Sequence, residues 1–179
     1  MSKGLNKEDL LVEEAKKDLE RFAELYDKYV EQIYRYVYRR VSDQQIAEDL
    51  VSQTFYDALS HLSSYEFRGY PFSAWLYKIA HNNVLKWYRT NSRMRSVDLE
   101  DISELKGDSD VVKEEILREE KQNVLEVLNR LEFEERELIR LKYFEDVSNM
   151  EIAQIMGITA NNVGVKLYRA LKKFKELIG

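Results

Sequence analysis

The chain has 179 residues, of which 34% are charged and 44% apolar; its net charge is −5, and it contains no cysteine. Disulfides, thiolate zinc sites and cysteine nucleophiles are therefore excluded. No stretch reaches the roughly 20 consecutive apolar residues of a membrane span, and the polar N-terminus lacks the apolar core of a signal peptide, so we expect a cytoplasmic protein.

The apolar residues of the N-terminal half recur at helical spacing and predict three helices. The first runs from about Leu19 to Val41, and Ser42 and Asp43 form the turn that starts the second. A loop from Ser63 to Pro71 leads into a third helix, which runs from about Phe72 to Arg93. The second helix is expected to place six side chains inward: Ile46, Leu50, Thr54, Phe55, Ala58 and Leu62.

Beyond the third helix, residues 96–110 are rich in acids and poor in large apolar side chains. Such a segment cannot bury enough apolar surface to order itself, so we interpret it as a flexible acidic linker. Residues 1–95 and 111–179 are then two small helical domains of an all-α protein. The second domain is expected to hold four helices, at about 111–131, 134–144, 150–156 and 160–178.

Charge is strongly segregated along the chain. Residues 67–97 carry six cations and no carboxylate, residues 98–120 carry ten carboxylates and three cations, and residues 159–179 carry five cations and one carboxylate. Two basic blocks separated by an acidic one indicate two surfaces for a polyanion. Solvated helix faces would give the same runs, so composition leaves both interpretations open.

The C-terminal domain contains the pattern of a helix-turn-helix. Ser148 and Glu151 fit a capping box, Gly157 suits the left-handed residue that ends a helix, and Thr159 can cap the next helix. A basic second helix after such a turn is typical of DNA recognition, although an ordinary helical hairpin is the alternative. The candidate DNA contacts are Thr159, Asn161, Asn162, Lys166, Arg169, Lys172 and Lys173.

The segment from Phe67 to Arg89 interleaves aromatic residues with cations and amides. Aromatic faces stack on unpaired bases, and nearby cations follow the backbone of a single strand. Trp75 is expected in the core, whereas Tyr70, Trp87 and Tyr88 suit either the core or base stacking. The candidate contacts to melted DNA are Arg68, Tyr70, Phe72, Asn82, Asn83, Lys86, Trp87, Arg89 and Arg93.

This segment resembles the promoter-melting and minus-ten-reading region of extracytoplasmic-function sigma factors, which belong to the sigma-70 family. The shared pattern is Phe-Arg-Gly, then Phe-x-x-Trp-Leu, then Ile-Ala-x-Asn. Residues 49–55 resemble the family segment that docks on the clamp helices of the largest core subunit of RNA polymerase, which implies that Asp49 and Gln53 bind polymerase. Residues from Leu131 to Ala170 resemble the minus-thirty-five reader.

The resemblance implies a sigma factor that binds core RNA polymerase and directs promoter-specific initiation. Its expected partners are promoter DNA, both as duplex and as single-stranded non-template strand, and an anti-sigma factor of the kind that commonly holds family members. Two alternatives remain from the residues alone: a free-standing helix-turn-helix regulator, and a polymerase-binding protein that supports no transcription.

No pattern in the chain predicts catalysis. His61 and His81 are the only histidines, twenty residues apart, and this spacing predicts packing or surface roles and no metal site. A glycine-rich phosphate loop is also missing from the sequence. We therefore expect a protein that is not an enzyme and that needs neither a cofactor nor a metal.

Overall fold

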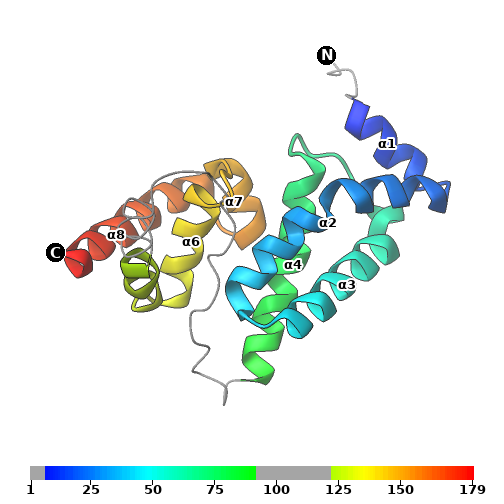
Figure 1. Ribbon diagram of the computed structural model, residues 1–179. Helices are drawn as coiled ribbons and strands as arrows, with labels where there is room; N and C mark the ends of the chain where they lie inside the picture. Colours follow the sequence, from blue (N-terminus) through cyan, green and yellow to red (C-terminus); the bar gives the residue numbers. More distant parts are fainter. Residues whose placement is uncertain (1–6, 92–121) are drawn as a thin grey trace, which may run out of the picture. The chain divides into compact units, whose positions relative to one another are not determined.

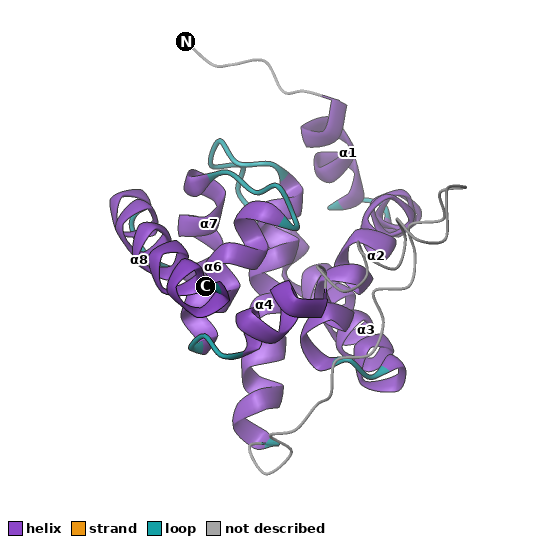
Figure 2. Ribbon diagram, turned by 60° about the vertical axis from the view of Figure 1, so that its left-hand side comes forward, coloured by secondary structure: helices purple, strands orange, loops and turns teal. Residues whose placement is uncertain are grey.

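The computed structural model describes residues 7–91 and 122–179, and within these ranges every regular element is a helix (Figures 1 and 2). The chain splits into two compact units, which confirms the predicted all-α fold with two helical domains. The predicted linker over 96–110 and the domain boundaries beside it lie outside the described residues. Among the described helices, none has the length and apolar character needed to cross a bilayer.

The N-terminal unit contains four helices and one short turn of 3₁₀ helix. Helix α2 packs against α1, α3 and α4, and α3 also packs against α4 (Figure 1). Helix α1 was not expected from the sequence, whereas the predicted bounds of α2 are confirmed. The elements are α1 (Lys7–Ala15), α2 (Leu19–Val41), α3 (Gln44–His61), η1 (Leu62–Ser64) and α4 (Phe72–Thr90).

Local capping explains where α2 and α3 begin and end. The Asp18 carboxylate accepts a hydrogen bond from the backbone N–H of Glu20, and Ser42 ends α2 in the left-handed region with φ of 50°. The Asp43 carboxylate then accepts from the N–H of Ile46 at 2.9 Å. Each carboxylate satisfies a backbone donor that the first turn of a helix leaves without a partner.

The core of the N-terminal unit differs from the prediction in two places. In α3 the buried face is formed by Ala47, Val51 and the three residues Thr54, Phe55 and Ala58, whereas Ile46 and Leu50 are half-buried. In α4 Trp75 is half-buried and Tyr77, at 2% exposed, takes the core position. Both errors have one cause: neighbouring residues are about 100° apart on a helix, so apolar side chains beside the stripe look equivalent in sequence.

The C-terminal unit contains a helical segment over 122–129 followed by three helices. Helices α6 and α8 pack against each other, and the core includes Leu128, Leu138, Leu141, Ile152, Ile155 and Val163. The described segment ends two residues before the predicted end at 131, and the bounds of the three helices lie within one residue of those predicted. They are α6 (Phe133–Tyr143), α7 (Asn149–Met156) and α8 (Ala160–Ile178).

The helix-turn-helix has the predicted capping contacts, both at the start of α7 and in the turn between α7 and α8. The backbone N–H of Ser148 donates to the Glu151 carboxylate at 2.9 Å, and the N–H of Glu151 donates to the Ser148 hydroxyl at 3.3 Å. Gly157 has a φ of 69°, and the Thr159 hydroxyl accepts from the N–H of Asn162. Together these contacts fix where α7 begins and where α8 starts.

The loop between η1 and α4 is anchored by Tyr65. Its ring lies 5.4 Å from that of Phe72 and 4.9 Å from that of Trp75, and the Lys16 ammonium lies 5.8 Å from its centroid. Burial raises the pKa of the Tyr65 phenol to about 12, and the nearby Asp9 carboxylate adds to the effect. Helix α1 therefore supplies a carboxylate near this loop, and Lys16, which directly follows α1, supplies a cation.

The raised pKa of Tyr65 predicts a loss of stability in alkali. Because folding favours the protonated phenol, its contribution is complete below the ordinary pKa of about 10 and is lost as the pH rises through about 12. At about pH 11 an ordinary phenol is about nine-tenths ionised, whereas Tyr65 in the folded chain should remain mostly neutral. The ultraviolet difference between the chain and its Tyr65→Phe variant measures this, and a full phenolate signal from folded protein at that pH would contradict it.

Candidate nucleic-acid interface

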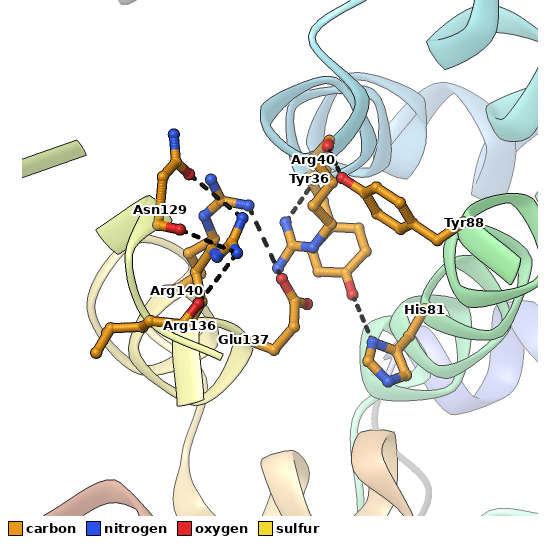
Figure 3. Close-up of polar contacts among 9 residues, drawn as sticks. Tyr36, Arg40, His81, Tyr88, Asn129, Arg136, Glu137 and Arg140 are labelled. Carbon is orange, nitrogen blue, oxygen red and sulfur yellow. Dashed lines mark hydrogen bonds and ion pairs between the residues drawn. The ribbon is translucent and has the colours of Figure 1, made fainter. Parts of the chain in front are cut away.

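Helix α4 is tied to α2 by polar contacts on its buried side (Figure 3). The Tyr36 hydroxyl lies 3.3 Å from Nδ1 of His81, and the Tyr88 hydroxyl donates to the backbone carbonyl of Arg40. The Arg40 guanidinium stacks 3.4 Å from the centroid of the Tyr36 ring. Both Tyr36 and His81 are buried, so these contacts fix which face of α4 turns inward.

The two histidines have ordinary structural surroundings. His81 is buried against Tyr36, and Nδ1 of His61 lies 2.8 Å from the backbone oxygen of Asp57. Within residues 7–91 and 122–179, no three metal-ligating side chains come together in a group that could hold an ion. The positions of both histidines fit the packing and surface roles expected from the sequence.

The opposite face of α4 carries several of the predicted DNA contacts. Asn82, Lys86 and Arg89 are exposed, and no carboxylate interrupts this helix. Trp87 is half-buried and packs edge-on to Tyr88, with ring centroids 5.0 Å apart. Trp87 therefore combines a packing role with some accessible ring surface. The predicted contact Arg93 lies outside the described residues.

Two predicted contacts of this region have partners within the unit. Phe72 is only 1% exposed and packs against Tyr29 and Tyr65, so in this conformation its ring is covered, and its contact with DNA stays a prediction. Asn83 is half-buried, and its amide donates to Asp57 at 3.0 Å. The sequence places both residues on a basic, aromatic helix but does not show that their side chains turn toward the core.

The loop before α4 adds two side chains to the same side of the unit. Arg68 is exposed and lies 3.4 Å from the Glu66 carboxylate, while Tyr70 is half-buried. Lys78 and Asn82 lie on α4, the helix into which this loop leads. Loop and helix together offer an amide, a phenol and cations, which is the combination that can stack on a base, bond its edge and hold its phosphate.

The outer side of α3 forms a separate polar surface. Asp49 and Gln53 are exposed and point away from the buried residues Val51 and Phe55. The Gln53 amide donates to the Asp57 carboxylate at 2.7 Å. The two residues predicted to bind polymerase are therefore accessible on one side of a single helix.

Helix α8 presents amides at its start and cations along its length. Asn161 and Asn162 are exposed at the N-terminal end, where a recognition helix meets base edges. Arg169 and Lys172 are also exposed. Thr159 is exposed, but its hydroxyl already serves as the helix cap. These positions agree with a helix that enters a groove by its N-terminal end.

The other two predicted cations of α8 are paired with carboxylates of α6. Lys166 lies 2.7 Å from Glu134, and Lys173 lies 2.7 Å from Glu135. The hydrogen bond from Lys173 lowers the pKa of the Glu135 carboxyl. The charge pattern of α8 alone did not reveal these pairs, because the partners lie more than 30 residues earlier in the sequence.

Comparison with protein families gives two matches in the order of the two units. Residues 25–94 match the model of sigma-70 region 2, and residues 121–174 match that of sigma-70 region 4. Helix α1 lies before the first match. The Phe-Arg-Gly loop, α3 and α4 belong to the region 2 match, and the helix-turn-helix belongs to the region 4 match.

Several curated relatives resemble the chain over most of its length. YlaC, an RNA polymerase sigma factor of Bacillus subtilis, is 32% identical over 163 residues, which cover 86% of this chain and 89% of YlaC. SigV of the same organism is 33% identical over 140 residues, covering 78% and 80%. The sigma factor BldN of Streptomyces coelicolor is 32% identical over 94% of this chain, which spans 64% of BldN.

Two solved structures share the fold at lower identity. CnrH, solved with the cytosolic domain of CnrY, has a TM-score of 0.71 at 22% identity and 97% coverage of both chains. RpoE of Bartonella quintana, solved with the anti-sigma factor NepR, has a TM-score of 0.64 at 24% identity, covering 88% of this chain and 96% of RpoE. The sigma-70 family is not known for enzymatic activity. The chain belongs to that family, in the extracytoplasmic-function group of factors that direct RNA polymerase to promoters.

Proposed function

We propose that three surfaces of this chain divide the work of promoter recognition. The outer side of α3, with Asp49 and Gln53, binds core RNA polymerase. The loop over 65–71 and the exposed face of α4 capture the melted minus-ten strand, and α8 binds the minus-thirty-five duplex. The observation that carries this proposal is the exposure of Asn82, Lys86 and Arg89 on α4, opposite the face that its polar contacts hold inward.

Strand capture by α4 has a simple energetic basis. Extruding a base from the duplex costs a few kcal/mol, and stacking on an aromatic side chain returns about 1–3 kcal/mol per base. Tyr70 and Trp87 offer ring surface for this stacking, and Asn82 offers a donor and an acceptor to a base edge. Lys86 and Arg89 can neutralise the phosphates that follow. The work is done by binding, and no catalytic group is needed.

Binding of duplex by α8 is proposed to combine base and phosphate contacts. Asn161 and Asn162 would meet base edges, while Arg169 and Lys172 would contact phosphates. Lys166 and Lys173 can join them only by exchanging their carboxylate partners for phosphate. The proposed partners also include core polymerase, because the relatives are named as RNA polymerase sigma factors. An anti-sigma protein is a further proposed partner, because RpoE was solved with one. We place this activity in the cytoplasm.

Transcription from two templates tests the assignment of strand capture to α4. On duplex promoter, Tyr70→Ala and Asn82→Ala should each lower open-complex formation about tenfold, the loss that corresponds to about 1.4 kcal/mol of stacking or base contact. A template premelted at the minus-ten region should restore much of this loss, because the duplex no longer has to be opened.

The matched variants are Arg169→Ala and Lys172→Ala in α8. They should weaken recruitment equally on both templates, since the upstream phosphates are present in both. If premelting rescues neither Tyr70→Ala nor Asn82→Ala while both remain folded, α4 is not the melting element. A chain that binds promoter DNA without core, or binds core without supporting transcription, would favour one of the two alternative functions.

Binding to core polymerase tests the assignment of α3. Asp49→Ala should weaken the affinity about tenfold, equivalent to 1.4 kcal/mol, because it removes an exposed charge from the proposed contact. Asp27→Ala removes another exposed carboxylate, from α2, and serves as the control. Fluorescence titration with labelled core measures both, and equal affinities for the two variants would remove Asp49 from the interface.

The paired lysines of α8 predict an unusual gain in DNA affinity. Replacing Glu134 and Glu135 by glutamine should free Lys166 and Lys173 for phosphate, so that binding tightens and the salt dependence steepens by about 0.9 for each added phosphate contact. Glu126→Gln combined with Glu176→Gln, which removes two exposed carboxylates elsewhere in the unit, controls for net charge. Titration of minus-thirty-five duplex at several salt concentrations measures the slope of log affinity against log salt. An unchanged slope would show that these lysines do not reach phosphate.

A further inference from the structure

Asn83 joins α4 to α3 through its side-chain amide. Its Nδ2 donates to Oδ2 of Asp57 at 3.0 Å and lies 3.4 Å from the hydroxyl oxygen of Thr54. Thr54 is fully buried, and its hydroxyl donates in turn to the backbone carbonyl of Leu50 at 2.7 Å. The amide of Asn83 therefore contacts Thr54 and Asp57, two side chains one turn apart on α3. A directional contact of this kind can form in only one register of the two helices.

The same carboxylate also contacts the outer surface of α3. Oδ1 of Asp57 accepts a hydrogen bond from Nε2 of Gln53 at 2.7 Å, and Gln53 is exposed beside the proposed polymerase contact Asp49. Each oxygen of Asp57 thus has one amide donor, one on each side. The half-buried carboxylate lies between the polymerase-facing side of α3 and the helix that carries Asn82.

Holding Asn83 also holds Asn82. Adjacent residues on a helix differ by about 100° in rotation and 1.5 Å in rise, so the position of Asn83 against α3 determines the direction in which the Asn82 amide projects. Apolar packing between the helices is non-directional, and both helices bury small residues, Ala58 on α3 and Ala80 on α4. Hydrogen bonds to a carboxylate are shorter and stronger than neutral ones and add the direction that such packing lacks.

We propose that Asp57, through Asn83, keeps the base-reading face of α4 in register with the polymerase-facing side of α3, and so acts as a positioning residue for promoter opening. The inference rests on the proposed functions of α3 and α4. Asp57 touches neither DNA nor the bound base in this role; it acts by fixing the helix that does.

A donor–acceptor exchange between positions 57 and 83 tests the inference. Asp57→Asn removes the charge, and Asn83→Asp places two carboxylates against each other; each should lower open-complex formation on duplex promoter about tenfold, the effect of losing one hydrogen bond to a charged group. In the double variant, the amide at position 57 can donate to the carboxylate at position 83 and still accept from Gln53. The double variant should therefore recover most of the wild-type level.

Three further measurements separate positioning from a merely structural role. Core affinity should change little in all three variants, thermal unfolding should show that each stays folded at the assay temperature, and a template premelted at the minus-ten region should reduce the defect of the single variants. Glu48→Gln is the matched control, because Glu48 accepts from Gln44 in the same i, i+4 geometry on α3; it should behave as the wild type.

The outcomes are decisive in either direction. Single variants with normal open-complex formation, a double variant that fails to recover, or a loss that simply follows the loss of stability would each overturn the inference. Failure of the proposed function gives a different result, since the unaltered chain would then not support transcription with core polymerase on either template.

Discussion

The arrangement of the N-terminal unit depends on the buried polar contacts that hold α4. A polar group removed from water costs free energy unless it is hydrogen-bonded, and the Tyr36 hydroxyl and the His81 imidazole are placed to satisfy each other in the core between α2 and α4. That pairing exists for only one rotation of α4 about its axis. The contacts therefore specify which face of the helix meets solvent, and the amides and cations on that face follow from it.

Most helices could be predicted from the sequence because capping residues mark their ends. Asp43, Ser148 and Thr159 all cap helices as expected, and the spacing of apolar residues gave the lengths between them. Helix α1 was not predicted because its segment is rich in charge and buries only Asp9, Val12 and Ala15. Its role becomes visible only in three dimensions, where its acidic residues lie near Tyr65.

The individual site residues were harder to predict than the helices that carry them. The sequence predicted a basic, aromatic helix, but it did not show that Phe72 is buried and Asn83 half-buried. Trp75, which was expected in the core, is only half-buried. Likewise, two of the cations in α8 are paired with carboxylates of α6 that no local pattern could connect to them. Composition indicates that a surface is charged; only the fold shows which of its charges already have partners.

The loop before α4 is held at both ends by aromatic side chains, Tyr65 on one side and the buried Phe72 on the other, and their rings are in contact. Gly69, with a φ of 82°, needs the backbone freedom of glycine, whereas the other residues between them can change with little effect on the core. Because the loop residues are separated from the core, mutations can change the loop without stabilising mutations elsewhere in the unit. With the loop in the proposed role of strand capture, related chains could in this way diverge in the DNA they prefer while the helices beneath the loop stay the same.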